Sequence, residues 1–260
     1  MRYRSVFIMF FLISGCVTQS NVPISHQAVS STSDTDDSAR GRARIHTDLA
    51  ANYLDIRNLG VALEEAGIAQ RADPTYGPAF NVAGLIYSEL NDDRMAEESF
   101  RQALRISAGD SDANNNYGTF LCQRKREEEG IKHFMLAVRD PLYQYPDRSF
   151  VNAGVCARRR GDLAEAENHF RSAIKVRPNQ IQALYQLADL AYLGGRYSEA
   201  RSFLSRLQSV AAGSPEILWL MLRTERRMGD RNSVDSLAHQ LRTNFPNSKE
   251  AELLSAGKFN

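Results

Sequence analysis

The sequence predicts an all-α protein, a right-handed α-solenoid built from about six repeats of one helix pair. Three observations predict this fold class. One pattern of bulky and small residues recurs six times between residues 43 and 246, the copies start 34 residues apart except for one step of 36, and turn-forming residues divide most copies in two. Because a single helix pair cannot bury its apolar face, neighbouring pairs are expected to stack into an elongated array.

The second copy shows the repeating pattern most completely. Bulky side chains occupy positions 4, 11 and 24, and small side chains occupy positions 8, 20 and 27; in order, these residues are Phe80, Tyr87, Phe100, Gly84, Ala96 and Ala103. Small residues let two helices cross closely, bulky residues fill the layer between them, and the spacing is that of the tetratricopeptide repeat. The alternative is a generic helical bundle with chance alanines, but six copies in one frame argue against it.

Turn and helix-ending residues set the expected boundaries of the elements. Gly161-Asp162 lies between the two helices of the fourth copy, and Pro178 ends the second of them because proline cannot continue a helix. The insertion Pro141–Pro146 lies between the third and fourth copies and indicates a kinked, exposed connection, which is either a contact surface or a plain spacer. Residues 247–260 predict a short capping helix and a tail.

Residues 1–15 have the features of a lipoprotein signal peptide. Arg2 and Arg4 precede an apolar run at residues 6–13, which is too short to span a membrane. Two small residues then precede Cys16, as in the lipobox of bacterial lipoproteins, where the signal is removed and the cysteine is acylated. An ordinary signal peptide with a chance cysteine is the alternative. Val17 follows in place of aspartate, and its resemblance to the sorting pattern of bacterial lipoproteins favours the periplasmic face of the outer membrane over retention in the inner membrane.

The segment 16–42 is predicted to be a lipidated, disordered tether. It is rich in serine, threonine and aspartate and has little apolar surface to bury. The lipid would therefore hold the repeats near a membrane while the tether lets them reach a partner.

The two remaining cysteines, Cys122 and Cys156, form an even pair in a chain that we expect to be exported. Both fall on first helices of neighbouring copies, and neighbouring helices can bring two cysteines within disulfide range. We favour a disulfide that links the third and fourth copies. Two buried thiols in apolar packing are the alternative.

The first helices of such repeats line a groove, and we expect a protein partner to bind there. Positions 2, 5, 6, 9, 12 and 13 point toward the groove, and amide side chains there can both donate to and accept from a peptide backbone. The candidate groove residues are Leu54, Asn81, Leu85, Asn115, Asn116, Thr119, Asn152 and Arg158. For any one of them alone, an ordinary solvated or helix-contact residue is the favoured interpretation, whereas the set as a whole favours the groove.

Several classes of function find no support in the sequence. The net charge of +1 gives no electrostatic footprint for nucleic acid. The five histidines are scattered without metal-ligand spacing, and we find no phosphate-binding loop or catalytic motif. We therefore expect no cofactor, no metal and no enzymatic activity, and we expect His46 to be a packed side chain.

Three stretches carry a resemblance that goes beyond the general repeat. They are residues 114–122 (NNNYGTFLC), the Pro141–Pro146 insertion and residues 151–156 (VNAGVC). Together with Cys16 and the six repeats, they resemble the type IV pilus biogenesis and stability lipoproteins of the PilW/PilF group. Thr119 departs from the bulkier aromatic residue expected at its position. Ala66 and Gly130 match the repeat pattern weakly, so we expect their repeats to be softened locally, with looser packing.

The resemblance implies the role of a pilotin. Such a protein binds the type IV pilus secretin, promotes its localisation and multimerisation in the outer membrane, and so supports pilus formation and twitching motility. We expect a monomer before the partner binds. The alternative is a general tetratricopeptide-repeat scaffold of the cell envelope, which would serve outer-membrane protein insertion or the assembly of cell-wall enzymes.

Overall fold

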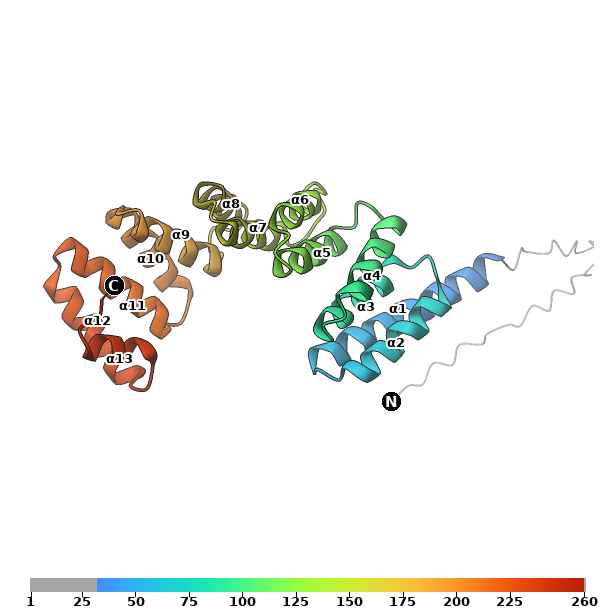
Figure 1. Ribbon diagram of the computed structural model, residues 1–260, viewed down its shortest axis with the longest axis horizontal. Helices are drawn as coiled ribbons and strands as arrows, with labels where there is room; N and C mark the ends of the chain where they lie inside the picture. The colour runs from blue at the N-terminus through green and yellow to red at the C-terminus, as the bar shows by residue number, and fades with distance from the viewer. Residues whose placement is uncertain (1–31, 260) are drawn as a thin grey trace, which may run out of the picture.

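The computed structural model describes residues 32–259, and in this range the chain forms thirteen α-helices and no β-strand (Figure 1). The helices are α1 (Thr32–Asp55), α2 (Leu59–Ala72), α3 (Gly77–Glu89), α4 (Asp93–Ile106), α5 (Ser111–Gln123), α6 (Glu127–Ala137), α7 (Pro146–Arg160), α8 (Leu163–Val176), α9 (Ile181–Leu193), α10 (Tyr197–Val210), α11 (Pro215–Met228), α12 (Arg231–Asn244) and α13 (Lys249–Ser255). None of these helices is long and apolar enough to cross a membrane.

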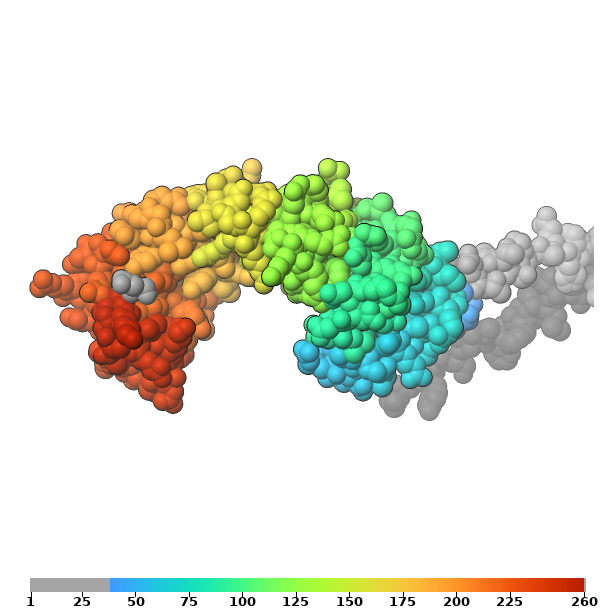
Figure 2. Space-filling view, viewed as in Figure 1, coloured from blue at the N-terminus to red at the C-terminus, as the bar shows by residue number. Residues whose placement is uncertain are grey.

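Consecutive helices pack as six pairs, from α1 with α2 to α11 with α12, and each pair stacks on the next. The prediction of an all-α repeat protein is therefore confirmed. Figures 1 and 2 show the stack as an arch, with α5 to α10 at its crown and the first and last repeats at its two ends. The short helix α13 packs against α11 and α12, where Ala251 and Leu254 are buried beside Trp219.

Aspartates begin many of the helices. The carboxylates of Asp92, Asp110 and Asp162 each accept a hydrogen bond from the backbone N–H three residues later, at 2.9 to 3.0 Å. These bonds satisfy N–H groups that have no partner within the helix, and they fix where each helix starts. At the other end of α7, Gly161 has a φ of +87°, the left-handed conformation that ends a helix.

The two helices of each central repeat cross where a glycine meets a phenylalanine ring. A Cβ atom added to Gly84 would lie 2.7 Å from the ring of Phe100, and one added to Gly154 would lie 2.5 Å from the ring of Phe170. The third repeat has the same arrangement at Gly118 and Phe134. The phenylalanine rings are 0 to 1% exposed. Each ring fills the space that a Cβ atom on the facing glycine would need.

The expectation of looser packing at Gly130 is wrong. A Cβ atom added to Gly130 would lie 2.7 Å from the carbonyl oxygen of Gly118, which shows that α5 and α6 approach closely. Glycine is required at this position because the two backbones touch here. Ala66 is also fully packed, at 1% exposure, in a small cluster with Ala50 and Ala62.

Helix α1 begins at Thr32, so the predicted disorder of the tether is wrong for residues 32–42. The guanidinium of Arg40 contacts Asp73 at 3.6 Å and lies over the ring of Tyr76. A helix that is already nucleated extends at little cost, and these contacts stabilise the extension. The predicted signal peptide, Cys16 and the rest of the tether lie outside the described residues.

The Pro141–Pro146 insertion connects α6 to α7 at the surface. Leu142 is 85% exposed and Tyr145 is 38% exposed, so the expectation of an exposed connection holds. The guanidinium of Arg148 lies 4.5 Å from the centre of the Tyr145 ring, and the hydroxyl of Ser149 approaches that of Tyr143 at 3.5 Å. These contacts fix the base of the connection and leave its tip exposed.

Candidate partner-binding groove

The first helices of the repeats, α1, α3, α5, α7, α9 and α11, line a groove, and Figure 1 shows α5, α7 and α11 on the inner side of the arch. Two hollows lie in this groove. The N-terminal hollow, of about 330 Å³, spans α1, α3 and α5, and the central hollow, of about 140 Å³, spans α5, α7 and α9. Thr119 and Gln123 line both hollows, so the two form one track.

The N-terminal hollow has an apolar floor and a charged rim. Its floor includes Leu54, Leu85 and Phe120, which come from three different first helices. At its rim the guanidinium of Arg57 pairs with the carboxylate of Glu89 at 2.9 Å. Such a surface can bury apolar side chains of a partner segment at its centre and interact with polar groups around it.

The central hollow is the smaller of the two, and five of its eight lining residues have polar side chains. Its lining consists of Thr119, Cys122, Gln123, Phe134, Asn152, Val155, Arg159 and Gln182. The polar groups here can donate to and accept from a peptide backbone.

Four of the asparagines form a hydrogen-bonded ladder across three first helices. The amide of Asn152 on α7 donates to Asn115 on α5 at 3.1 Å, Asn115 donates to Asn116 at 3.5 Å, and Asn116 donates to Asn81 on α3 at 3.2 Å. The hydroxyl of Ser149 also donates to Asn115 at 2.9 Å. Some of the donors and acceptors of these amides therefore form hydrogen bonds between neighbouring repeats and hold the repeats together.

The candidate groove residues divide into two groups. Leu54, Leu85, Asn116, Thr119 and Asn152 line the track. The other three, Asn81, Asn115 and Arg158, line neither hollow. Asn81 is 7% exposed, and Asn115 is at the centre of the ladder.

Arg158 links the fourth repeat to the fifth. Its guanidinium donates to Gln186 and to Asp189, both at 2.5 Å, and both acceptors lie on α9. Because both of its terminal nitrogens already donate to residues of α9, Arg158 positions the neighbouring helix. It would have to give up an ion pair to contact a ligand.

Cys122 and Cys156 form a disulfide between α5 and α7, with their Cα atoms 5.8 Å apart. Cys122 is part of the lining of the central hollow. The bond fixes the two helices that carry the track at the boundary between the third and fourth repeats.

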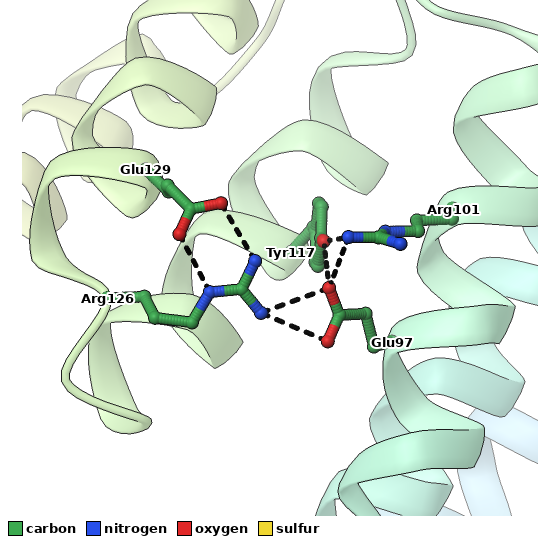
Figure 3. Close-up of polar contacts among 5 residues, drawn as sticks. All are labelled: Glu97, Arg101, Tyr117, Arg126 and Glu129. Atoms are coloured by element: carbon green, nitrogen blue, oxygen red, sulfur yellow. Dashed lines mark hydrogen bonds and ion pairs between the residues drawn. The ribbon is translucent and has the colours of Figure 1, made fainter.

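A second polar cluster joins the second repeat to the third (Figure 3). Arg126 donates to both oxygens of Glu97 at 3.0 Å and to both oxygens of Glu129 at 2.8 Å. The hydroxyl of Tyr117 also donates to Glu97 at 3.0 Å, and Arg101 pairs with Glu97 at 2.7 Å. Burial acts to raise the pKa of Glu97, but the hydrogen bonds from Arg126 and Tyr117 lower this pKa on balance.

Several lining residues were missed from the sequence, and three of them are Phe120, Gln123 and Gln182. Gln123 and Gln182 occupy positions 13 and 2 of their copies, so the repeat frame could have identified them. Phe120 is at position 10, which is not one of the six groove positions, and it is 3% exposed at the floor of the hollow.

His46 is half-buried on α1, and its Nδ1 lies 2.5 Å from Glu65 Oε2 on α2. It is packed in the first repeat, as expected. Among residues 32–259, no three histidine, cysteine, aspartate or glutamate side chains are grouped so that they could hold a metal ion.

Comparisons with known proteins identify the repeats and a similar protein. A sequence profile described as tetratricopeptide repeat matches residues 157–223, and another with the same description matches residues 77–110. The chain is 27% identical over 257 residues to the type IV pilus assembly protein PilF of Pseudomonas aeruginosa, and the match covers 99% of both chains.

Two solved structures are similar over most of the chain. The structure of Pseudomonas aeruginosa PilF has a TM-score of 0.75 at 27% identity, covering 86% of this chain and 99% of that one. The crystal structure of PilW, described as a widely conserved type IV pilus biogenesis factor, has a TM-score of 0.72 at 31% identity, covering 82% of this chain and 98% of that one.

Proposed function

The chain belongs to the PilF/PilW family of type IV pilus tetratricopeptide-repeat proteins, and from this premise we propose that it is an outer-membrane pilotin that binds the type IV pilus secretin. The observation that carries the proposal is the track along the first helices, which combines an apolar floor with polar groups. A segment of the secretin binds in this track, and the bound subunit is thereby kept from aggregating before the ring assembles.

The N-terminal sequence supports the proposed location. Acylation of Cys16 would anchor the protein at the periplasmic face of the outer membrane, since several acyl chains together hold a protein firmly in a bilayer. An anchor at one end and a binding track in the repeats raise the local concentration of secretin subunits at the membrane. This concentration favours their multimerisation.

The N-terminal hollow supports binding of an apolar segment. Leu54 and Leu85 are only partly buried, and they lie on α1 and α3, so a partner can cover both at once. Burying apolar area of this kind is the dominant favourable contribution to most protein associations.

The experiment places a charge in the track. The double variant Leu54→Glu/Leu85→Glu is expected to bind the purified periplasmic part of the secretin about tenfold more weakly or worse, because a carboxylate would be desolvated on binding. In cells the same variant is expected to lower the amount of secretin multimer in the outer-membrane fraction. Leu163→Glu is the matched control, because Leu163 is 49% exposed on α8 and lies outside the track.

Two further measurements distinguish binding of the secretin from anchoring in the membrane. Cys16→Ala is expected to keep the affinity measured in solution and to leave the protein in the soluble periplasmic fraction. Circular dichroism checks that the leucine variant keeps its helicity. Unchanged secretin binding by a folded Leu54→Glu/Leu85→Glu variant would overturn the proposal.

A further inference from the structure

Three arginines at the C-terminal end of the groove line a hollow of about 260 Å³ together with Tyr192 and Phe259. Arg223, Arg226 and Arg227 lie in the second half of α11. They occupy positions 9, 12 and 13 of the sixth copy, the positions that face the groove in the other repeats. Thr119 and Gln123, which line the track, occupy two of the same positions in the third copy.

The charges of these arginines are not balanced within the described part of the chain. No carboxylate between residues 32 and 259 lies within 4.0 Å of the guanidinium groups of Arg223, Arg226 or Arg227, whereas Arg126 and Arg171 each contact two glutamates. The Nε–H of Arg223 is buried and has no hydrogen-bond acceptor among residues 32–259. A buried donor without an acceptor is costly, so an anionic oxygen that reaches this donor would be stabilised.

Aromatic rings hold the guanidinium groups in place. Arg223 lies 4.7 Å from the ring centre of Tyr192, Arg226 lies 3.8 Å from that of Phe259, and Phe259 stacks on Trp219 at 5.5 Å. Contacts between a guanidinium and an aromatic face position the cation without neutralising it. The donors are therefore ordered in advance, which reduces the entropy lost when a ligand binds.

We propose that this hollow, which we call the arginine pocket, binds an acidic side chain of the peptide segment that occupies the groove. A guanidinium presents two parallel N–H groups that match the two oxygens of a carboxylate. The rings of Tyr192 and Phe259 pack against the methylene groups of a glutamate. The inference rests on the proposed function in taking the ligand to be a peptide, and it adds that the segment carries acidic residues at the end that reaches the sixth repeat.

The test uses the full chain and two synthetic probes. The first is an acetylated, fluorescein-labelled decapeptide of alternating leucine and glutamate, and the second has glutamine in place of each glutamate. By fluorescence anisotropy, the wild-type protein is expected to bind the glutamate peptide about tenfold more tightly than the glutamine peptide. This preference is expected to weaken with added salt.

Variants then test whether the preference for the glutamate peptide arises in the arginine pocket. Arg226→Gln/Arg227→Gln changes two exposed side chains, so it keeps the fold, and it is expected to lose most of the preference; adding Arg223→Gln is expected to remove the rest. The matched control is Arg105→Gln/Arg139→Gln/Arg242→Gln, which changes the charge equally at exposed residues outside the groove and is expected to keep the preference. A double or triple pocket variant that keeps the full preference would overturn the proposal.

Two outcomes distinguish this proposal from the proposed function. Leu54→Gln/Leu85→Gln, which adds no charge, is expected to weaken binding of both peptides while leaving their ratio unchanged, because these leucines lie on α1 and α3, at the other end of the arch from α11 (Figure 1). If secretin assembly proves independent of the track, the proposed function is wrong. The preference for the glutamate peptide over the glutamine peptide still tests whether the arginine pocket binds an acidic side chain. Binding of inorganic phosphate that is lost in the pocket variants, without any preference for the glutamate peptide, would assign the pocket to another oxyanion and contradict the peptide ligand.

Discussion

At the scale of single residues, the two helices of a repeat pack together because the side chains at positions 8 and 24 have complementary sizes. A smaller residue at position 8 leaves room for a larger one at position 24. The second, third and fourth repeats use glycine at position 8 and phenylalanine at position 24, as in Gly154 and Phe170. The fifth repeat uses Ala188 with Leu204, and the side chains of Phe170, Ala188 and Leu204 are at most 2% exposed. Well-packed interiors tolerate little change in volume, so one member of such a pair constrains the other.

The pair in the fourth repeat gives a prediction for stability. Gly154→Ala is expected to lower the free energy of unfolding by about 1–3 kcal/mol, because the new methyl group would overlap the Phe170 ring. Urea denaturation measures the change. Gly154→Ala/Phe170→Leu, which copies the fifth repeat, is expected to recover part of the loss. The control is Gly60→Ala in α2, where a Cβ meets no atom within 4 Å and the change is expected to be neutral or slightly stabilising.

At the scale of elements, ion pairs connect the second helices of neighbouring repeats. On α8, Glu167 accepts hydrogen bonds from Arg196 at 2.7 and 2.9 Å and from Arg171 at 2.7 and 3.0 Å. Both arginines also contact Glu199 on α10, at 2.9 and 2.5 Å. Hydrogen bonds from Arg196, opposed by burial and supported by those from Arg171, lower the pKa of Glu167 from 4.5 to about 2.

This lowered pKa predicts how the array responds to acid. A carboxylate with a lowered folded-state pKa stabilises the fold fully above its unfolded pKa, and the contribution is lost as the pH falls from about 5 to about 2. At pH 7, Glu167→Gln is therefore expected to lower the free energy of unfolding by up to roughly 3 kcal/mol, and the difference from wild type should shrink toward zero in this acidic range.

Denaturant midpoints measured at several pH values check the prediction for Glu167. Glu64→Gln is the control, since Glu64 is exposed and forms no ion pair with the described residues. A difference between Glu167→Gln and wild type that stays constant from pH 7 to pH 3 would show that the lost stability is unrelated to the charge of Glu167.

At the scale of the whole molecule, stability depends on contacts between neighbours, because each repeat of a solenoid touches only the repeats beside it. A single weak junction can therefore divide the array into two parts that unfold separately. The disulfide between Cys122 and Cys156, the Asn152–Asn115 hydrogen bond and the contact of Ser149 with Asn115 all hold the junction between the third and fourth repeats. This junction also carries the central hollow of the track.

Removing the disulfide is expected to weaken this junction most. Cys122→Ser/Cys156→Ser should lower the free energy of unfolding by roughly 3–4 kcal/mol, the value expected for a bond that closes a loop of 34 residues. Hydrogen exchange should accelerate first in α5 and α7. A reducing agent is expected to lower the melting temperature of the wild type and leave that of the variant unchanged; equal melting temperatures for both proteins without reductant would contradict the prediction.

The sequence by itself determined the helix pairs, their turns and the row of positions that faces the groove. These features follow from local rules, because a helix places every third or fourth residue on one face and aspartate or glycine sets its ends. Leu54, Leu85 and Thr119 could be assigned to the groove in this way. The beginning of α1 at Thr32 could not, since the contacts of Arg40 with Asp73 and Tyr76 involve residues more than thirty positions apart.

Only the tertiary structure decided which groove residues face a ligand and which hold the repeats together. Asn81 and Asn116 share the chemistry expected of peptide-binding residues, but the stacking of α3 on α5 brings their amides together and buries Asn81. The arginine pocket needs Phe259 to return from the end of the chain onto α11. The repeat pattern sets where a residue lies on its own helix, whereas the angle and distance between helices, which decide what that residue touches, result from packing along the whole array.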